Sequence, residues 1–465
     1  MEKHLLSKTT YIKGEQCLMQ LYLTKRFPKL RDRLPAERLA IFSRGTNVGI
    51  YAQQLFPNGI DAGPKHYSQY QKAIALTKEL MEKGQKVIYE AAFQSNKTLI
   101  LLDILVKNDD MWDAYEVKSS VKLSDTYYKD AALQYNVLIN SGIKINSFSL
   151  IHIDKDYVRS GEIDINSLFI ISDVTESVKS QFEIVNDKIN EKLDSINSVT
   201  APIVTLGHQC YHPYDCDFIG HCWKNIKSPS IFDIPSIELK QQFMLHRKYG
   251  HLSKILQSNE NLNEYQTTEI NSQIAQSDYF ELSDDTLEEF EELYNSDEEI
   301  FALKVLHFTP ALPLYGNTKP YHKIAFAYAM MPIDGSSNPI IHISNGQDNP
   351  EIEIIERLNN QSNDKLYITY SNNNEDVESL DLQQIIDNGE YYSPAMKKDY
   401  SNKSLSKAMG NRSQWMAIES DIVAAQYYDE ILRGHAKSEE KLLKIKDYLI
   451  NEVQLVKQFF EFVSQ

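Results

Sequence analysis

The segment LLDILVKNDDMWDAYEVKSSVK, at positions 101–122, is the feature that most constrains the fold of this chain. Two apolar runs flank Asp109-Asp110, a pair of residues typical of tight turns, so the segment predicts an antiparallel hairpin. Pairing that is symmetric about this turn places opposed residues at positions that sum to 219. Asp103 and Glu116 satisfy that sum, and we expect them to face one another on adjacent strands.

Lys118 is expected on the same face as Glu116, because side chains two residues apart along a strand point to the same side of the sheet. Two opposed carboxylates repel one another unless a cation lies between them, and Mg²⁺ or Mn²⁺ prefers such hard oxygen ligands. An adjacent lysine can orient a water molecule and stabilise phosphate charge during hydrolysis. The alternative interpretation is an ordinary solvent-facing set of Asp, Glu and Lys side chains on an exposed hairpin.

The surrounding sequence alternates helical and strand-like patterns, which predicts an α/β domain over residues 1–226. Helices are expected near residues 11–26, 37–56, 67–84 and 125–140, and strands near 87–94, 98–106, 112–118 and 146–154. A linker punctuated by Pro and Ser follows, and residues 227–300 predict a helical connector. Residues 301–465 contain strands followed by helices, which predicts a second α/β domain.

The charge and hydropathy of the chain limit its partners. Its 465 residues carry a net charge of −17, so affinity for nucleic acid would require positive charge concentrated in one place. The sequence shows no basic segment followed by an apolar leader, and no apolar run approaches the roughly 18 residues that span a membrane. We therefore expect a cytoplasmic protein without a membrane partner.

The cysteines form a pattern of their own. Three of them are spaced C-x5-C-x5-C and the fourth lies far upstream: Cys210, Cys216, Cys222 and Cys17. A cytoplasmic chain is not expected to hold a disulfide framework, whereas thiolates in this number bind iron–sulfur clusters or zinc. Structural zinc usually uses cysteines two to four residues apart, so the wider spacing favours an iron–sulfur cluster. Three neighbouring histidines keep zinc as the alternative: His208, His212 and His221.

The hairpin acids, the E-V-K triplet and the glutamine on the following helix together resemble the PD-(D/E)XK nuclease superfamily and, within it, the RecB-like branch. The resemblance implies a restriction-endonuclease-like core with the catalytic set Asp103, Glu116, Lys118 and Gln134. It also implies a divalent metal, Mg²⁺ or Mn²⁺, held by Asp103, Glu116, Val117 and Glu90. Tyr127, Asp130 and Gln134 share one face of the predicted helix, so Gln134 can point towards the site.

One position departs from this resemblance. Many RecB-like nucleases carry a histidine in an early helix, and the corresponding residue in SRGTNVGIYAQ is Gly49. The missing imidazole is expected to weaken or alter metal binding.

The cysteine layout, with one cysteine before the nuclease core and three after it, resembles iron–sulfur nucleases such as the CRISPR-associated RecB-family exonucleases and the AddB-type helicase–nuclease subunits. This resemblance implies a [4Fe-4S] cluster that joins the N-terminal helix to the end of the core. The stretch FTPALPLYGNTKPYHKIAFAYAMM resembles a bacterial family in which such a domain is fused to a DnaQ-like domain of ribonuclease-H fold. His307 and Thr309 replace the expected acids of its first strand, and Asn451-Glu452 lies near the expected last one, which implies a degenerate exonuclease fold.

These features predict a metal-dependent DNA nuclease with a structural [4Fe-4S] cluster, acting on single- or double-stranded DNA in DNA processing or defence. The C-terminal domain is expected to serve as a scaffold or as a surface for nucleic acid or a protein partner. Two alternatives stay open: a nucleic-acid-binding or scaffold protein that has lost catalysis, and an interaction protein stapled by zinc.

Overall fold

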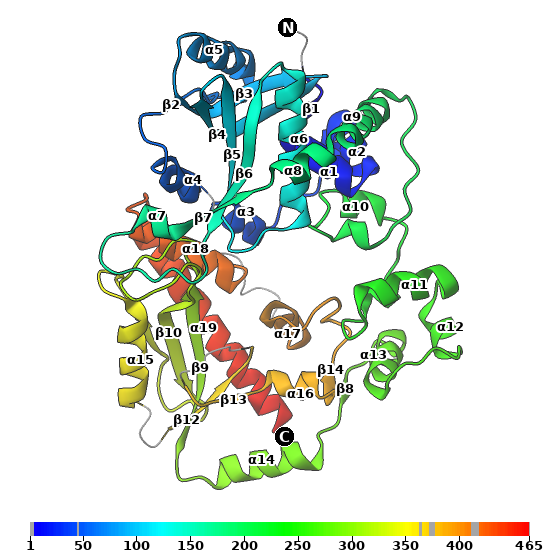
Figure 1. Cartoon of the computed structure of the whole chain (residues 1–465). Helices are drawn as coiled ribbons and strands as arrows, with labels where there is room; N and C mark the ends of the chain where they lie inside the picture. The colour runs from blue at the N-terminus through cyan, green and yellow to red at the C-terminus, as the bar shows by residue number, and fades with distance from the viewer. Residues whose placement is uncertain (1–3, 44–45, 362–364, 372–376, 411–417, 465) are drawn as a thin grey trace. The chain divides into compact units, whose positions relative to one another are not determined.

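The computed structural model divides the chain into two compact units (Figure 1), and it describes residues 4–43, 46–361, 365–371, 377–410 and 418–464. Unit 1 comprises Met1–Leu34, Ile41–Lys224 and Pro310–His322. Unit 2 comprises Pro35–Ala40, Asn225–Thr309 and Lys323–Gln465. Both units combine helices with a sheet, in agreement with the predicted α/β class. Among the described helices, none has the length and apolar character needed to cross a membrane.

Unit 1 is built on a mixed seven-stranded sheet in which β2-β3-β4-β5-β6-β7 are successive neighbours and β1 pairs with β4. The strands are β1 (Leu6–Ser7), β2 (Ile60–Asp61), β3 (Val87–Ser95), β4 (Thr98–Asn108), β5 (Met111–Lys118), β6 (Ile145–Ile153) and β7 (Phe169–Asp173). β3, β4 and β5 form an antiparallel meander, and β6 returns parallel to β5 after a helical crossover. The parallel β5–β6 pair requires such a crossover, which α6 provides.

Helices cover both faces of this sheet. They are α1 (Lys8–Gln16), α2 (Leu18–Arg26), α4 (Thr46–Gln53), α5 (Tyr70–Glu82), α6 (Asp125–Asn140), α7 (Ile165–Leu168), α8 (Thr175–Ser180), α9 (Phe182–Asn197) and α10 (Ile219–Cys222). Successive residues of β5 enter different cores: Ala114 packs with residues of α1, α6 and α9, whereas Tyr115 packs with residues of α4. This alternation is the period of two that the hairpin sequence predicts.

The predicted hairpin register is confirmed. β4 and β5 pair Ile104 with Tyr115 and Asn108 with Met111, so the paired positions sum to 219. Asp109 has a φ of 48°, in the left-handed region that Asp tolerates in tight turns.

The helix predicted over residues 11–26 is wrong in one respect, because the chain is extended at Cys17, between α1 and α2, with φ −163° and ψ 122°. Residues 15–19 contain neither Gly nor Pro, the residues that most often interrupt a helix. The sequence therefore gave no sign of this interruption. The helix predicted over residues 37–56 is likewise divided into α3 (Ala36–Ser43) and α4, and residues 44–45 lie outside the described ranges.

Unit 2 contains a five-stranded sheet with the order β11-β10-β9-β12-β13. Its strands are β9 (Glu299–Phe308), β10 (Ile324–Pro332), β11 (Ile340–Ile343), β12 (Lys365–Thr369) and β13 (Leu380–Asp381). β9, β10 and β11 are antiparallel, whereas β12 runs parallel to β9 and β13 runs parallel to β12. β8 (Tyr279–Phe280) and β14 (Tyr391–Tyr392) form a separate pair.

The principal helices of unit 2 are α11 (Leu239–Tyr249), α12 (Leu252–Leu256), α13 (Glu264–Ala275), α14 (Asp284–Asn295), α15 (Pro350–Gln361), α16 (Gln383–Asp387), α17 (Asn402–Ala408), α18 (Asp421–Leu432) and α19 (Ser438–Val463). α15 packs on one face of the sheet through Ile354 and Leu358. α18 packs on β9 and β10 through Tyr428, whose ring stacks on Phe326. Residues 227–300, predicted as a connector, contain α11 to α14 and belong entirely to this unit.

Replacing Phe148 of β6 tests how much the core between the sheet and helices α1, α6 and α9 contributes to the stability of unit 1. Its side chain is fully buried, so Phe148→Ala should lower the free energy of unfolding by about 3–5 kcal/mol, as is typical of Phe→Ala cavities. Urea denaturation followed by circular dichroism measures the change. Phe27→Ala is the matched control, because Phe27 is 48% exposed and its loss should cost much less. Equal losses for the two variants would contradict the assignment of this core.

Candidate functional site

Three carboxylates form a row across neighbouring strands of unit 1, here called the carboxylate row: Glu90, Asp103 and Glu116. The β3–β4 pairs on either side, Tyr89–Ile104 and Ala91–Leu102, place Glu90 opposite Asp103. The β4–β5 register places Asp103 opposite Glu116. Glu90 has a φ of 51°, which is uncommon for a residue other than glycine and marks an irregularity of β3 at this row.

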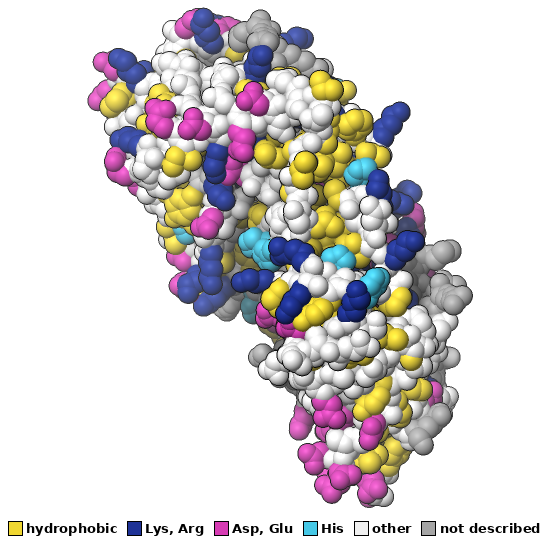
Figure 2. Space-filling model, turned by 90° about the vertical axis from the view of Figure 1, so that its right-hand side faces the viewer, with side chains coloured by type: hydrophobic (Ala, Val, Ile, Leu, Met, Phe, Trp, Pro, Cys, Tyr) yellow, Lys and Arg dark blue, Asp and Glu magenta, His cyan; other side chains and the backbone are white. Residues whose placement is uncertain are grey.

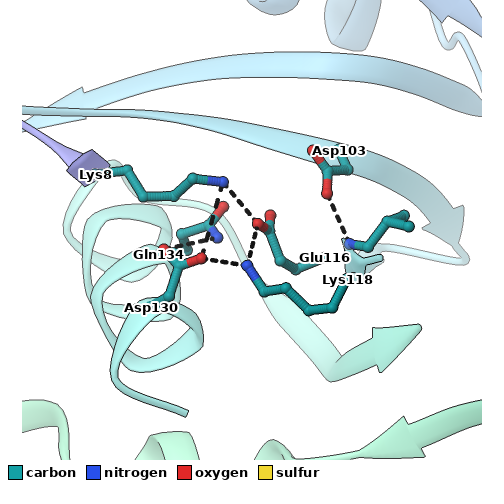
Figure 3. Close-up of polar contacts among 7 residues, drawn as sticks. Lys8, Asp103, Glu116, Lys118, Asp130 and Gln134 are labelled. Carbon is teal, nitrogen blue, oxygen red and sulfur yellow. Dashed lines mark hydrogen bonds and ion pairs between the residues drawn. The ribbon is translucent and has the colours of Figure 1, made fainter. Parts of the chain in front are cut away.

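Glu116 is the centre of the site, where the ammonium groups of Lys8 and Lys118 both meet its carboxylate (Figure 3). It is only 2% exposed. Its Oε1 accepts hydrogen bonds from two ammonium groups, Lys118 Nζ at 2.7 Å and Lys8 Nζ at 2.6 Å. Its Oε2 is buried and has no hydrogen-bond partner among the described residues. Burial alone would raise the pKa of Glu116, but the two lysines hold that pKa well below its usual range. Glu116 is therefore ionised at neutral pH.

Helix α6 contributes two further side chains. Asp130 Oδ2 accepts a hydrogen bond from Lys118 Nζ at 2.5 Å, and Gln134 Nε2 lies 3.5 Å from Asp130 Oδ1. Gln134 is fully buried, and its Oε1 has no hydrogen-bond partner within the residues that the structure describes. The Lys118 ammonium also lies 5.2 Å from the ring centroid of Tyr127. The prediction that this face of the helix points towards the site is therefore confirmed.

Asp103 is held differently from Glu116. Its Oδ2 accepts a hydrogen bond from the backbone N–H of Val117 at 2.6 Å. Burial raises the pKa of Asp103 to about 8, and the neighbouring Glu116 carboxylate adds to this effect. Burial also raises the pKa of Glu90; the Lys8 ammonium opposes this effect, and the Glu116 and Asp61 carboxylates add to it. Near neutral pH, Asp103 therefore retains a proton.

Two members of this site were not proposed from the sequence, Lys8 and Asp130. Asp130 was recognised only as a neighbour of Gln134 on the helix, although its spacing pointed to the site. Lys8 had no such signal, because it lies 108 residues before Glu116 and reaches it only through the pairing of β1 with β4.

Gly49, the position that departs from the RecB-like pattern, lies in α4. A Cβ atom built at Gly49 would have no described heavy atom within 4 Å. The local structure around this residue therefore does not require glycine.

The structure brings all four cysteines together, here called the cysteine cluster: Cys17, Cys210, Cys216 and Cys222. They line one small cavity of about 30 Å³ together with apolar neighbours that include Phe218 and Trp223. Burial raises the pKa of Cys216 to about 12, and the three other sulfur atoms add to this effect. The histidines that kept zinc open as an alternative are not among the described residues that line the cavity.

Polar contacts tie α1 to the segment that carries the three later cysteines. Gln16 Nε2 donates to the carbonyl oxygens of Gln209 and Tyr214, at 2.7 and 2.6 Å. Lys13 Nζ lies 2.6 Å from the buried carboxylate of Asp217. The extended conformation of Cys17 follows directly after this anchored helix.

Within the described ranges, no three His, Cys, Asp or Glu side chains are arranged as a preformed metal-ion group. In the carboxylate row, ammonium groups lie against Glu116.

Unit 2 contains a separate charged cluster beside a cavity of about 560 Å³. Lys304 of β9 is 3% exposed, and its Nζ lies 2.9 Å from Asp421 Oδ2 and 3.4 Å from Glu452 Oε2. Lys304 and Asp421 were not identified from the sequence. Burial lowers the pKa of His307 to about 3, so this histidine is neutral at ordinary pH.

No protein-family model matches this chain, and no curated protein matches it either.

The raised pKa of Asp103 predicts how pH affects stability. Between about pH 4, where an ordinary Asp titrates, and about pH 8, the folded state binds a proton that the unfolded state has lost. Stability should therefore fall as pH rises through this window, by at most about 1.4 kcal/mol per pH unit from this group. Urea unfolding in EDTA at a series of pH values should show a shallower fall for Asp103→Asn than for the wild type. Parallel profiles would contradict the raised pKa.

Proposed function

We propose that unit 1 is a metal-dependent nuclease that hydrolyses phosphodiester bonds in DNA. The observation that carries this proposal is a pair of buried oxygen atoms without hydrogen-bond partners in the described part of the chain, Glu116 Oε2 and Gln134 Oε1, in the same site as Asp103. Buried polar atoms are rarely left unpaired, so these two oxygens call for a further group. Carboxylate and amide oxygens are the donors that Mg²⁺ and Mn²⁺ prefer, and the donor set therefore fits the expected cation.

The order of elements supports this proposal. The helix α5 is followed by the antiparallel strands β3, β4 and β5, the crossover helix α6 and the parallel strand β6. This succession is the one expected of a restriction-endonuclease-like core. It places the acid of β4 beside the E-x-K residues of β5.

Each side chain has a distinct part in the proposed reaction. Asp103, Glu116 and Glu90, with Val117, are the proposed positions for the cation, which supplies Lewis-acid polarisation of the phosphate when bound. Lys118 presents a charged ammonium that stabilises the negative charge developing on the phosphate and orients the attacking water. Asp130 and Glu116 hold that ammonium in place through hydrogen bonds of 2.5 and 2.7 Å.

The charge distribution of unit 2 is compatible with DNA as the partner. Residues 239–257, which include α11 and α12, contain no Asp or Glu and expose four cationic side chains: Lys240, Arg247, Lys254 and Lys248, the last of which pairs with Glu260 at 2.7 Å. Figure 2 shows that carboxylates gather instead over the lower end, where α14 lies. Positive charge concentrated on one segment can contact phosphates even when the whole chain is acidic.

The strand order and directions in unit 2 support a ribonuclease-H-like arrangement. In such an arrangement, acids of the first strand and of later helices hold catalytic metals. The first strand, β9, instead presents Lys304 to Asp421 and Glu452. We therefore propose that unit 2 is a non-catalytic scaffold or a surface for DNA or a protein partner.

The cysteine cluster is the proposed site of a [4Fe-4S] centre. Four free thiols around one apolar cavity fit the donor set of such a cluster. Its proposed role is structural, because Cys17 comes from the N-terminal helices and the other three cysteines follow the nuclease core.

A second candidate function is nucleic-acid binding without catalysis. The observation that favours it is the double neutralisation of Glu116 by Lys8 and Lys118, which reduces the attraction of this carboxylate for a divalent cation.

A cleavage assay separates these candidates. With Mn²⁺ or Mg²⁺, the wild type should cleave single- or double-stranded DNA, and Asp103→Ala or Lys118→Ala should lower the rate by roughly 100-fold or more while binding persists. Lys129→Ala is the matched control, because Lys129 is an exposed lysine of α6 and its loss should leave the rate unchanged. If the wild type cleaves neither single-stranded nor double-stranded DNA with Mn²⁺ or Mg²⁺, the result favours the non-catalytic function.

Metal analysis tests the cysteine cluster. Protein purified without oxygen should be brown and contain four iron atoms per chain, as expected of a [4Fe-4S] cluster, and Cys216→Ser should lose most of this iron. Elemental analysis and visible absorbance measure the outcome. A colourless protein with one zinc ion per chain would overturn the iron–sulfur assignment and favour a zinc staple.

A further inference from the structure

Lys8 is the first residue of α1, and its backbone position is fixed from two sides. The preceding residues Leu6 and Ser7 pair with β4, and Ser7 forms a capping box with Thr10 at the start of the helix. The other end of α1 is tied by Lys13 and Gln16 to the segment that carries three cysteines. Lys8 is therefore presented to the carboxylate row by an anchored helix.

Lys8 and Lys118 use the same oxygen atom of Glu116, but they differ in their further contacts. Lys118 Nζ has a second close acceptor, Asp130 Oδ2 at 2.5 Å, and the Lys118 side chain is 12% exposed. Lys8 Nζ is 3.9 Å from that atom, and the Lys8 side chain is 29% exposed. Lys8 thus has one close acceptor where Lys118 has two, and its side chain is the more exposed of the two.

We propose that Lys8 is a positioning residue that occupies one side of Glu116 and competes with the divalent cation for that carboxylate, thereby setting the metal affinity of the site. This inference rests on the proposed nuclease function. Like charges repel, so a divalent cation beside Glu116 is disfavoured for as long as the Lys8 ammonium remains in contact with the same oxygen. When the cation binds, the long and partly exposed Lys8 side chain withdraws towards solvent.

This role differs from that of Lys118. Removing Lys118 deletes an ammonium that the proposed reaction uses, whereas removing Lys8 deletes a competitor. The two substitutions should therefore change metal binding and cleavage in different ways. A structural ion pair alone would not produce a gain in metal affinity.

Mn²⁺ binding measures this competition without relying on activity. Electron paramagnetic resonance of free Mn²⁺, titrated with protein, gives the affinity for the wild type, Lys8→Met, Lys8→Gln and Lys8→Arg. Removal of the charge should tighten Mn²⁺ binding about tenfold or more, a conservative value for one unit charge within a few ångströms at partial exposure. Lys8→Arg keeps the charge and should bind Mn²⁺ like the wild type. Glu116→Gln should abolish the gain when it is combined with Lys8→Met.

Lys188→Met is the matched control, because Lys188 pairs with Glu15 of α1 at 2.7 Å, away from the carboxylate row. Its Mn²⁺ affinity should equal that of the wild type. Circular dichroism shows whether each variant is folded, and Lys8→Gln serves in place of Lys8→Met if the latter does not fold.

The outcomes distinguish this inference from the proposed function. Tighter binding by the neutral Lys8 variants supports the competition, even if the wild type binds Mn²⁺ too weakly to detect. Binding of Mn²⁺ with equal affinity by the wild type and by the neutral Lys8 variants overturns the competition but leaves the proposed metal site intact. Failure of every protein to bind Mn²⁺ overturns both.

Discussion

The pairing of β4 with β5 about Asp109-Asp110 fixes the chemistry that unit 1 can carry. Because side chains alternate between the two faces of a strand, a slip of one residue would turn Asp103 and Glu116 to opposite sides of the sheet. Packing on both faces resists such a slip, since it would move Ala114 into the core beside α4 and Tyr115 into the core beside α6. The same packing that stabilises the core therefore also maintains the carboxylate row.

Placing this row inside the protein has an electrostatic cost that the surroundings offset unevenly. Glu116 receives two ammonium groups, whereas Asp103 receives one backbone N–H and lies next to another acid. A buried charge is stable only when it is paired and hydrogen-bonded, so the unequal compensation leaves Glu116 ionised and Asp103 inclined to hold a proton. Stability alone does not explain this arrangement, because an apolar core would fold at least as well.

Unit 2 shows a second solution to the same electrostatic problem. There the buried cation is Lys304, which lies between Asp421 and Glu452 at hydrogen-bonding and ion-pairing distances. The cluster supplies its own positive charge, and the pKa of Lys304 is raised by those two acids although burial alone would lower it. Among the described residues, both clusters keep buried oxygens without a hydrogen-bond partner: Glu116 Oε2 and Gln134 Oε1 in unit 1, and Glu452 Oε1 in unit 2.

The sequence by itself determined the local features of this protein. Turn residues and the period of two predicted the β4–β5 register. The helical period of α6 placed Tyr127, Asp130 and Gln134 on one face. Both patterns could be read from the sequence because they are set by neighbours within a few residues. The spacing of the cysteines predicted a shared site, and the structure brings them together. Only the tertiary structure decided the remainder. Lys8 reaches Glu116, and Lys304 meets Glu452, through contacts between residues far apart in the chain. The extended conformation of Cys17 likewise depends on the tertiary structure. No local pattern encodes which distant side chain will compensate a buried charge.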